Sequence, residues 1–262
     1  IGYFQIPKNT FTYRPQVALS ASDSIVYQAI INIIADKYEI QLTEHAGKRS
    51  FGNIYAGRKS EFMFKKWKSM YIQFQNTVEK MRKEKGFKWQ AEIDISGFYD
   101  NIQHSILKEI LQGKIDDKLC KLLICFLEDC QAQCTGSRLP FGIPQGPMPS
   151  HLLANVYLLR LDDMLKADEI EYARYVDDFW IVSENQTHLI EVIVNLQGQL
   201  GKLGLSFQSK KTSIQEIEKS DPPDFASFGS YAQSPAFTDS PTIDEIHPES
   251  SSQQDLEITE YN

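Results

Sequence analysis

Apolar residues recur at helical spacing in six stretches of the chain, and each stretch predicts a helix. The six are 22–40, 60–86, a run from about His104, 117–134, 151–165 and 188–204. Ser22 or Asp23 can cap the first helix, because either side chain can accept a hydrogen bond from a free backbone N–H. Gly204 is expected to end the last helix, because glycine readily adopts the left-handed conformation that follows a helix.

Runs rich in β-branched and aromatic residues lie between these helices and predict four strands. They are 89–95, 171–176, 179–183 and 205–214. Only Asp177 and Asp178 separate the middle two, which indicates a hairpin. Strand, helix, hairpin, helix, strand is the βαββαβ order of a ferredoxin-like sheet. We therefore expect an α+β fold whose antiparallel sheet packs helices on one face and leaves the other face open to a ligand.

Charge is distributed unevenly along the 262 residues, whose net charge is −8. Residues 218–262 hold ten acidic residues and one basic residue, so the remainder of the chain is close to neutral. This acidic segment is rich in Ser and Pro and lacks periodicity, and we expect it to be disordered or to bind a partner. Lys48–Lys88 holds twelve Lys or Arg and three Glu, enough to attract a phosphate backbone. The alternative is a solvated helix face.

The remaining composition argues against a membrane-spanning protein and against a secreted one. No run of about 18 apolar residues and no charged leader is present, so we expect neither a membrane span nor a signal peptide. The four cysteines, which are Cys120, Cys125, Cys130 and Cys134, form no CxxC pair. They favour reduced thiols in a cytoplasmic protein, with a zinc site as the alternative.

Three carboxylates fall where the predicted strands end. Asp94 closes the first strand of the sheet, and Asp177 and Asp178 occupy the predicted hairpin tip. In a βαββαβ sheet the first strand lies beside the hairpin, so these side chains can meet. Converging carboxylates bind hard divalent cations such as Mg²⁺, and two such ions can promote an in-line phosphoryl displacement. Taken alone, an Asp-Asp turn is better explained as a polar hairpin.

Four segments occur in the order of the palm motifs of reverse transcriptases, and the chain resembles that family. They are DISGFYDNI (94–102), GIPQG (142–146), YVDD (175–178) and LGLSFQSKKT (203–212), with a weaker match to the fingers at 14–30. The resemblance implies a right-hand polymerase. Residues 1–88 would form a basic, fingers-like region, 89–217 the catalytic palm, and 218–262 a tail with no recognisable thumb.

Carried over to this sequence, the resemblance implies a two-ion Mg²⁺ site, with Mn²⁺ as a substitute. Asp94, Asp177 and Asp178 would be the metal ligands, and the carbonyl of Ile95 would contribute. Tyr99 would lie beneath the incoming sugar and exclude a 2′-hydroxyl, which favours deoxynucleotides. The alternative for Tyr99 is a core aromatic residue.

The resemblance also implies substrate contacts outside the carboxylates. Gln145 and Gly146 would face the nascent base pair and the template. Lys211, or less plausibly Lys210, would contact the triphosphate or protonate pyrophosphate. Arg58 is a candidate for a fingers contact to the phosphates. For each of these residues a solvated or purely structural role is the alternative.

The function that follows is an RNA-directed DNA polymerase, a nucleotidyltransferase acting on dNTPs, an RNA template and nascent DNA. YVDDF and GIPQGP look most like the bacterial abortive-infection and defence-associated reverse transcriptases, which implies a role against phage. A partner protein, a homo-oligomer or a structured noncoding RNA would supply the missing thumb. The alternatives are a template-independent or protein-primed DNA polymerase, with Tyr231 or Tyr261 as primer, and a non-catalytic nucleic-acid-binding subunit.

Overall fold

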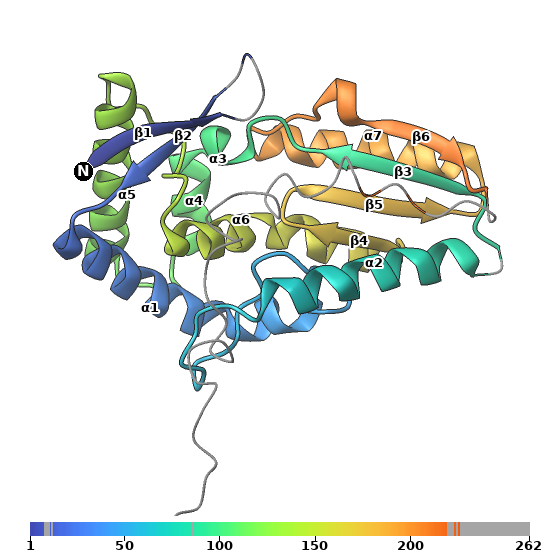
Figure 1. Ribbon diagram of the computed structural model, residues 1–262, viewed down its shortest axis with the longest axis horizontal. Coiled ribbons are helices and arrows are strands. Elements are labelled where there is room, and N and C mark those ends of the chain that lie inside the picture. The colour runs from blue at the N-terminus through green and yellow to red at the C-terminus, as the bar shows by residue number, and fades with distance from the viewer. Residues whose placement is uncertain (8–10, 12, 85, 219–222, 224, 226–262) are drawn as a thin grey trace, which may run out of the picture. The chain divides into compact units, whose positions relative to one another are not determined.

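A four-stranded antiparallel sheet organises the chain, as the computed structural model shows (Figure 1). The structure describes residues 1–7, 11, 13–84, 86–218, 223 and 225. The strands are β1 (Gly2–Pro7), β2 (Tyr13–Ala18), β3 (Trp89–Asp94), β4 (Tyr172–Tyr175), β5 (Asp178–Ser183) and β6 (Ser213–Glu216). The helices are α1 (Ala21–His45), α2 (Trp67–Lys83), α3 (Phe98–Asn101), α4 (His104–Leu111), α5 (Asp117–Thr135), α6 (Met148–Ala167), α7 (Gln186–Lys202) and the 3₁₀ turn η1 (Ser209–Lys211).

The strand order confirms the predicted ferredoxin-like α+β fold. The sheet runs β4-β5-β3-β6, which is the order that a βαββαβ unit produces. All three pairings are antiparallel. β3 pairs with β5 so that Asp94 lies opposite Asp178, which brings the ends of two strands that are distant in sequence to one edge.

One face of this sheet rests on α6 and α7, which lie across it in Figure 1. Tyr172 and Arg174 of β4 both hydrogen-bond to Asp162 of α6, and Ser183 of β5 bonds to His188 of α7. Fully buried apolar residues of α1 pack in turn against α6. The helices therefore fix the position of the sheet from one side, as the sequence predicts.

The opposite face of the sheet is not open throughout, and this part of the prediction is wrong. Phe74 of α2 packs on Tyr175 with the ring centroids 5.7 Å apart. Phe225, beyond the last strand, lies 5.9 Å from both Phe74 and Trp180, and Trp180 is fully buried. The large aromatic side chains of β4 and β5 need an apolar cover, because leaving them in water would cost free energy. The cover comes from α2 and the chain after β6.

Local element boundaries also differ from the prediction. Ser20 caps α1 in place of Ser22 or Asp23, because its side-chain oxygen accepts a hydrogen bond from the Asp23 N–H. The second helix begins at Trp67. The last strand begins only at Ser213, because residues 209–211 form a 3₁₀ turn.

Three further features concern the first hairpin, the end of α7 and the cysteines of α5. The hairpin of β1 and β2 was not predicted, because its strands lie in a stretch without clear alternation. Gly204 follows α7 with a φ of +67°, as expected of a residue that ends a helix. The four cysteines are free thiols on α5, and burial raises the pKa of Cys130 to about 12.

The proposed acidic tail, 218–262, lies almost wholly outside the described residues, as do Tyr231 and Tyr261. The division at residue 88 into a fingers-like region and a palm stays a prediction. Among the described residues, none of the helices is long and apolar enough to cross a bilayer.

The packing of α2 on the sheet can be tested by substitution. Phe74→Ala should lower the free energy of unfolding by about 3–5 kcal/mol, because the fully buried ring leaves a cavity between α2 and β4. Ile72 lies on the same helix but is 56% exposed, so Ile72→Ala should change it by less than about 0.5 kcal/mol. Equal losses in urea unfolding would show that α2 does not dock through Phe74.

Candidate active site

The predicted carboxylates lie at one end of the sheet. Asp94 is the last residue of β3 and pairs with Asp178, the first residue of β5. The hairpin tip consists of Val176 and Asp177, since Tyr175 pairs directly with Asp178. The sequence placed both aspartates at the tip, whereas the structure places Asp178 in the strand. The difference matters because a strand residue projects at right angles to the sheet, in a direction set by the pleat.

Of the three carboxylates at this end of the sheet, Asp177 is the least exposed. Its side chain is buried, and its Oδ1 finds no hydrogen-bond partner among the described residues. Burial, together with the negative charge of Asp94, raises the pKa of Asp177 to about 7. Burying an ionised oxygen without a partner is costly, so such an atom is suited to a ligand that brings positive charge. The carboxylate set therefore fits a divalent cation.

Lys211 forms an ion pair with Asp94 at this site. Its Nζ lies 2.5 Å from Asp94 Oδ2. Burial alone would lower the pKa of the Lys211 ammonium, but the hydrogen bond to Asp94 and the charges of all three carboxylates raise it. Lys211 thus lies beside the predicted metal ligands, and Lys210 occupies the same 3₁₀ turn without a contact to them among the described residues.

The ligand atoms of Asp94, Asp177 and Asp178 do not all lie as close to one another as those of a bound-metal site would. In the described part of the chain, the acidic and imidazole groups whose ligand atoms lie within 4.8 Å of one another are Glu44, His45 and Asp163. In that second cluster the side chains already have partners, because Lys166 pairs with Glu44 and His45 Nε2 lies 3.0 Å from Asp163 Oδ1. The sheet-end carboxylates, by contrast, repel one another and keep an unpaired buried oxygen.

The hairpin tip that carries Asp177 is conformationally strained. Val176 has a φ of +59°, a left-handed conformation that β-branched residues rarely adopt. Gly52 lies directly against it, and a Cβ at Gly52 would approach Val176 N and Cγ2 to 2.5 Å. Backbone strain of this kind persists only where surrounding contacts impose it, and it is concentrated at functional sites.

Tyr99 lies deeper than its predicted role requires. It is 2% exposed, and its hydroxyl is 2.7 Å from His151 Nδ1. Burial, reinforced by the charge of Arg14, lowers the pKa of His151 to about 4, so its ring is neutral at pH 7. Phe98 packs edge-on against Tyr99 at 5.5 Å. A sugar can reach this ring only if the groups that cover it move.

The loop that contains Gln145 and Gly146 is held between α3 and β2. The Gln145 side-chain amide donates to Asp100 Oδ1 at 2.8 Å, and the backbone carbonyl of Gln145 accepts from the Val17 N–H at 2.8 Å. Gly146 has a φ of +108°, and a Cβ there would lie 2.7 Å from Gln16 Oε1. The positive φ favours glycine here, whereas the close contact is with the flexible end of the Gln16 side chain.

Ile95 follows the last residue of β3 and forms an isolated bridge with Phe207. The two backbone bonds that flank this bridge join Ser96 N to Ser206 O and Gln208 N to Asp94 O. Neither uses the Ile95 carbonyl, so that oxygen is not committed to the bridge. Its contribution to a metal site stays a prediction.

The phosphate contact proposed for Arg58 receives no geometric support. Its guanidinium, 75% exposed, lies 3.6 Å from Asp36 of α1, and the backbone N–H of Arg58 donates to Glu39. Arg14 is the cation that the sequence did not single out: its charge partly offsets the rise in the pKa of Asp177 and of Tyr99 that burial causes, and it adds to the fall in the pKa of His151. The match of 14–30 to the fingers contains Arg14, and that was the available signal.

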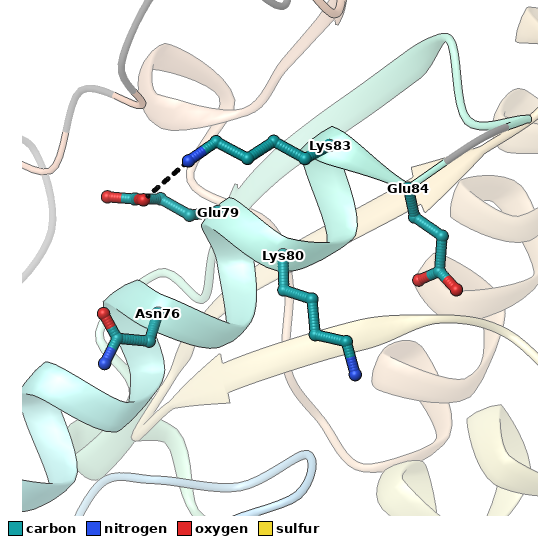
Figure 2. Close-up of a pocket in the computed structure, with 5 residues that line it drawn as sticks. All are labelled: Asn76, Glu79, Lys80, Lys83 and Glu84. Carbon is teal, nitrogen blue, oxygen red and sulfur yellow. Dashed lines mark hydrogen bonds and ion pairs between the residues drawn. The ribbon is translucent and has the colours of Figure 1, made fainter.

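The basic region has no concentrated phosphate site on the exposed side of α2. A pocket of about 500 Å³ is lined by Asn76, Glu79, Lys80, Lys83 and Glu84, whose side chains are drawn in Figure 2. Two lysines and two glutamates offset one another there, and Lys83 Nζ is 3.2 Å from Glu79 Oε2. This part of the charge run is therefore explained by a solvated helix face.

The pKa of Asp177 can be tested without a substrate. Because its pKa is raised above the ordinary value of 3.8, the wild-type protein loses stability relative to Asp177→Asn as pH rises from about 4 through about 7. In EDTA, Asp177→Asn should raise the unfolding midpoint at pH 8 by at least about 2 °C, and by less at pH 4.5. An exposed control, Glu61→Gln, should show no such difference. Equal effects of Asp177→Asn at both pH values would contradict the raised pKa.

Comparison with known sequences identifies relatives among intron-encoded proteins. The group II intron-encoded protein LtrA of Lactococcus lactis subsp. cremoris is 31% identical over 144 residues, which is 50% of this chain and 23% of LtrA. An uncharacterized 91 kDa protein in the cob intron of Schizosaccharomyces pombe is 34% identical over 91 residues, which is 34% of this chain and 11% of that protein. The chain thus spans less than a quarter of the length of these two relatives.

Solved structures and a family model agree with the predicted fold. Telomerase from Candida tropicalis, in complex with a TWJ fragment of telomeric RNA, superposes with a TM-score of 0.55 at 16% identity over 82% of this chain and 41% of that one. Telomerase from Candida albicans gives a TM-score of 0.50 at 11% identity over 85% of this chain and 44% of that one. The family model described as "Reverse transcriptase (RNA-dependent DNA polymerase)" matches residues 6–236. The chain therefore belongs to the reverse transcriptase family.

Proposed function

We propose that this chain contains the catalytic region of an RNA-directed DNA polymerase that adds dNTPs to a 3′-hydroxyl with the aid of two divalent cations. One observation carries the proposal: the pairing of β3 with β5 sets Asp94 opposite Asp178, beside a strained turn that presents Asp177. Since the chain belongs to the reverse transcriptase family, the reaction that these carboxylates would serve is the addition of a dNTP to a 3′-hydroxyl.

Asp94, Asp177 and Asp178 would hold the cations, Mg²⁺ or its substitute Mn²⁺, and Ile95 would add its carbonyl oxygen. The bound cations would activate the 3′-hydroxyl and stabilise the departing pyrophosphate. The orphaned Oδ1 of Asp177 supports this assignment, because a buried carboxylate with a raised pKa gains most from a nearby positive charge.

Two basic side chains would serve the triphosphate. Lys211 lies against Asp94 with its proton firmly held, so it can present a protonated Nζ to the phosphates or to pyrophosphate once Asp94 has another partner. Arg14 acts on Asp177 and on Tyr99 through its charge and is the better candidate than Arg58. Gln145 and Gly146 would face the nascent base pair from the loop beside β2.

RNA is the proposed template. The telomerase that superposes on this chain is described in complex with an RNA fragment, and Lys48–Lys88 provides an excess of positive charge. Since the chain spans only part of its relatives, a thumb supplied by a partner protein, a homo-oligomer or a structured noncoding RNA also belongs to the proposal. A role in bacterial defence against phage is supported only by the likeness of YVDDF and GIPQGP.

Nucleotide incorporation tests the reaction directly. With Mg²⁺ and a primed RNA template, the chain should incorporate labelled dNTPs, and Asp177→Asn/Asp178→Asn should reduce the rate at least about 100-fold. Asp163→Asn, in the second acidic cluster, is the matched control and should retain the rate. Incorporation without added template would favour the untemplated or protein-primed polymerase. A double variant as active as the wild type would refute the proposed site.

Sugar selection tests the role of Tyr99. Tyr99→Ala should raise ribonucleotide incorporation relative to dNTPs by about tenfold or more, because removal of the ring opens space for a 2′-hydroxyl. Tyr99→Phe keeps the ring and should retain the discrimination. If Tyr99→Ala leaves the dNTP-to-rNTP ratio unchanged in competition assays, Tyr99 is the core aromatic residue that its 2% exposure suggests.

A further inference from the structure

A fully buried ion pair lies directly behind the hairpin tip. Arg174 of β4 is 1% exposed and Asp162 of α6 is 0% exposed. The guanidinium reaches both carboxylate oxygens, with Nε 3.0 Å from Oδ1 and Nη2 2.6 Å from Oδ2. Burying two charges costs several kcal/mol per ion, so such a pair is weak evidence for a purely stabilising role. Its remaining hydrogen bonds indicate what else it does.

The remaining nitrogen of Arg174 bonds to the strained turn. Nη1 donates to the Val176 carbonyl at 2.7 Å and to Asn155 Oδ1 at 3.0 Å. Val176 has the left-handed φ, and its carbonyl belongs to the peptide bond that joins it to Asp177. Asp162 fixes the guanidinium plane, and that plane fixes the carbonyl.

Asn155 extends the same network to the loop that packs against the turn. Its side-chain amide donates to the carbonyls of Gly52 and Asn53 at 3.0 and 2.9 Å. Gly52 in turn leaves no room for a Cβ against Val176. The backbone of Arg174 also bonds to this loop, with its N–H 2.6 Å from the Arg49 carbonyl. The turn is therefore held by the guanidinium of Arg174 and by the backbone of the loop that contains Gly52.

We propose that Arg174 is a positioning residue: anchored by Asp162, it holds the Val176–Asp177 turn in its strained conformation and so sets the direction of Asp177 and Asp178 toward the divalent cations. The inference rests on the proposed function, because it assigns a purpose to the same carboxylates. Arg174 itself touches no substrate.

A lysine could not take over this arrangement. The guanidinium spreads its N–H groups in a rigid planar fork, which here serves a carboxylate, a carbonyl and an amide at once. A lysine ammonium can pair with Asp162 but cannot also reach the Val176 carbonyl from the same position. Arg174→Lys thus keeps the charge and removes the tether.

The main variant removes the tether while sparing the fold. Arg174→Met/Asp162→Leu replaces the buried pair with apolar side chains of similar volume, a change that is often neutral or stabilising. Tyr172→Phe is the matched control, since it removes a hydrogen bond to the same Asp162 without touching the turn. Three readouts are compared: the unfolding midpoint, Mn²⁺ binding followed by loss of the free-ion EPR signal, and the Mg²⁺ dependence of incorporation.

A positioning role predicts a split between stability and metal affinity. The double variant should unfold within a few degrees of the wild type, yet bind Mn²⁺ about 10–100-fold more weakly, as loss of an orienting partner of a metal ligand does. Arg174→Lys should show the same weakening, and Tyr172→Phe should not. The Mg²⁺ concentration for half-maximal incorporation should rise by a similar factor.

The opposite result is equally specific. A folded double variant, or a folded Arg174→Lys, with wild-type Mn²⁺ affinity would overturn the inference and leave Arg174 a structural residue. If the double variant does not fold, Arg174→Lys decides alone. Asp178→Asn separates this outcome from failure of the proposed function: wild-type Mn²⁺ binding by Asp178→Asn would refute the carboxylate site itself, whatever Arg174 does.

Discussion

Like charges held close together at the end of an antiparallel sheet repel one another, and much of this structure can be understood as a response to that repulsion. Asp94 and Asp178 are brought together by the register of β3 and β5, which the fold cannot relax without losing the sheet. The ammonium of Lys211 on Asp94 and the raised pKa of Asp177 both reduce the repulsion.

The elements packed behind the sheet hold this unfavourable arrangement in place. Val176 stays in an unfavourable backbone conformation because α6 contributes the Arg174 partner and the 50–53 loop closes on the turn. The aromatic side chains of β4 and β5 are covered by α2 and by Phe225, which stiffens the strands that lead to the carboxylates. Rigid support of this kind keeps ligands oriented before the ion arrives.

Sequence patterning predicted the parts of this fold that depend on period and order. The βαββαβ succession, the helix through the cysteines and the end of α7 at Gly204 follow from local signals. Other features depend on contacts that no local pattern encodes. The burial of Tyr99 against His151, the placing of Arg58 on Asp36 and the cover over Trp180 come from distant segments that meet only in the folded chain. Arg14 was within the recognised segment, but its proximity to Asp177 needed the fold.

The most direct test of the account is a crystal structure with Mn²⁺ and a dNTP, in which anomalous scattering locates the ions. The account predicts anomalous density between Asp94, Asp177 and Asp178, with Lys211 moved off Asp94 and the Val176 carbonyl still bonded to Arg174. Density at Glu44, His45 and Asp163 instead, or none at the end of the sheet, would contradict it.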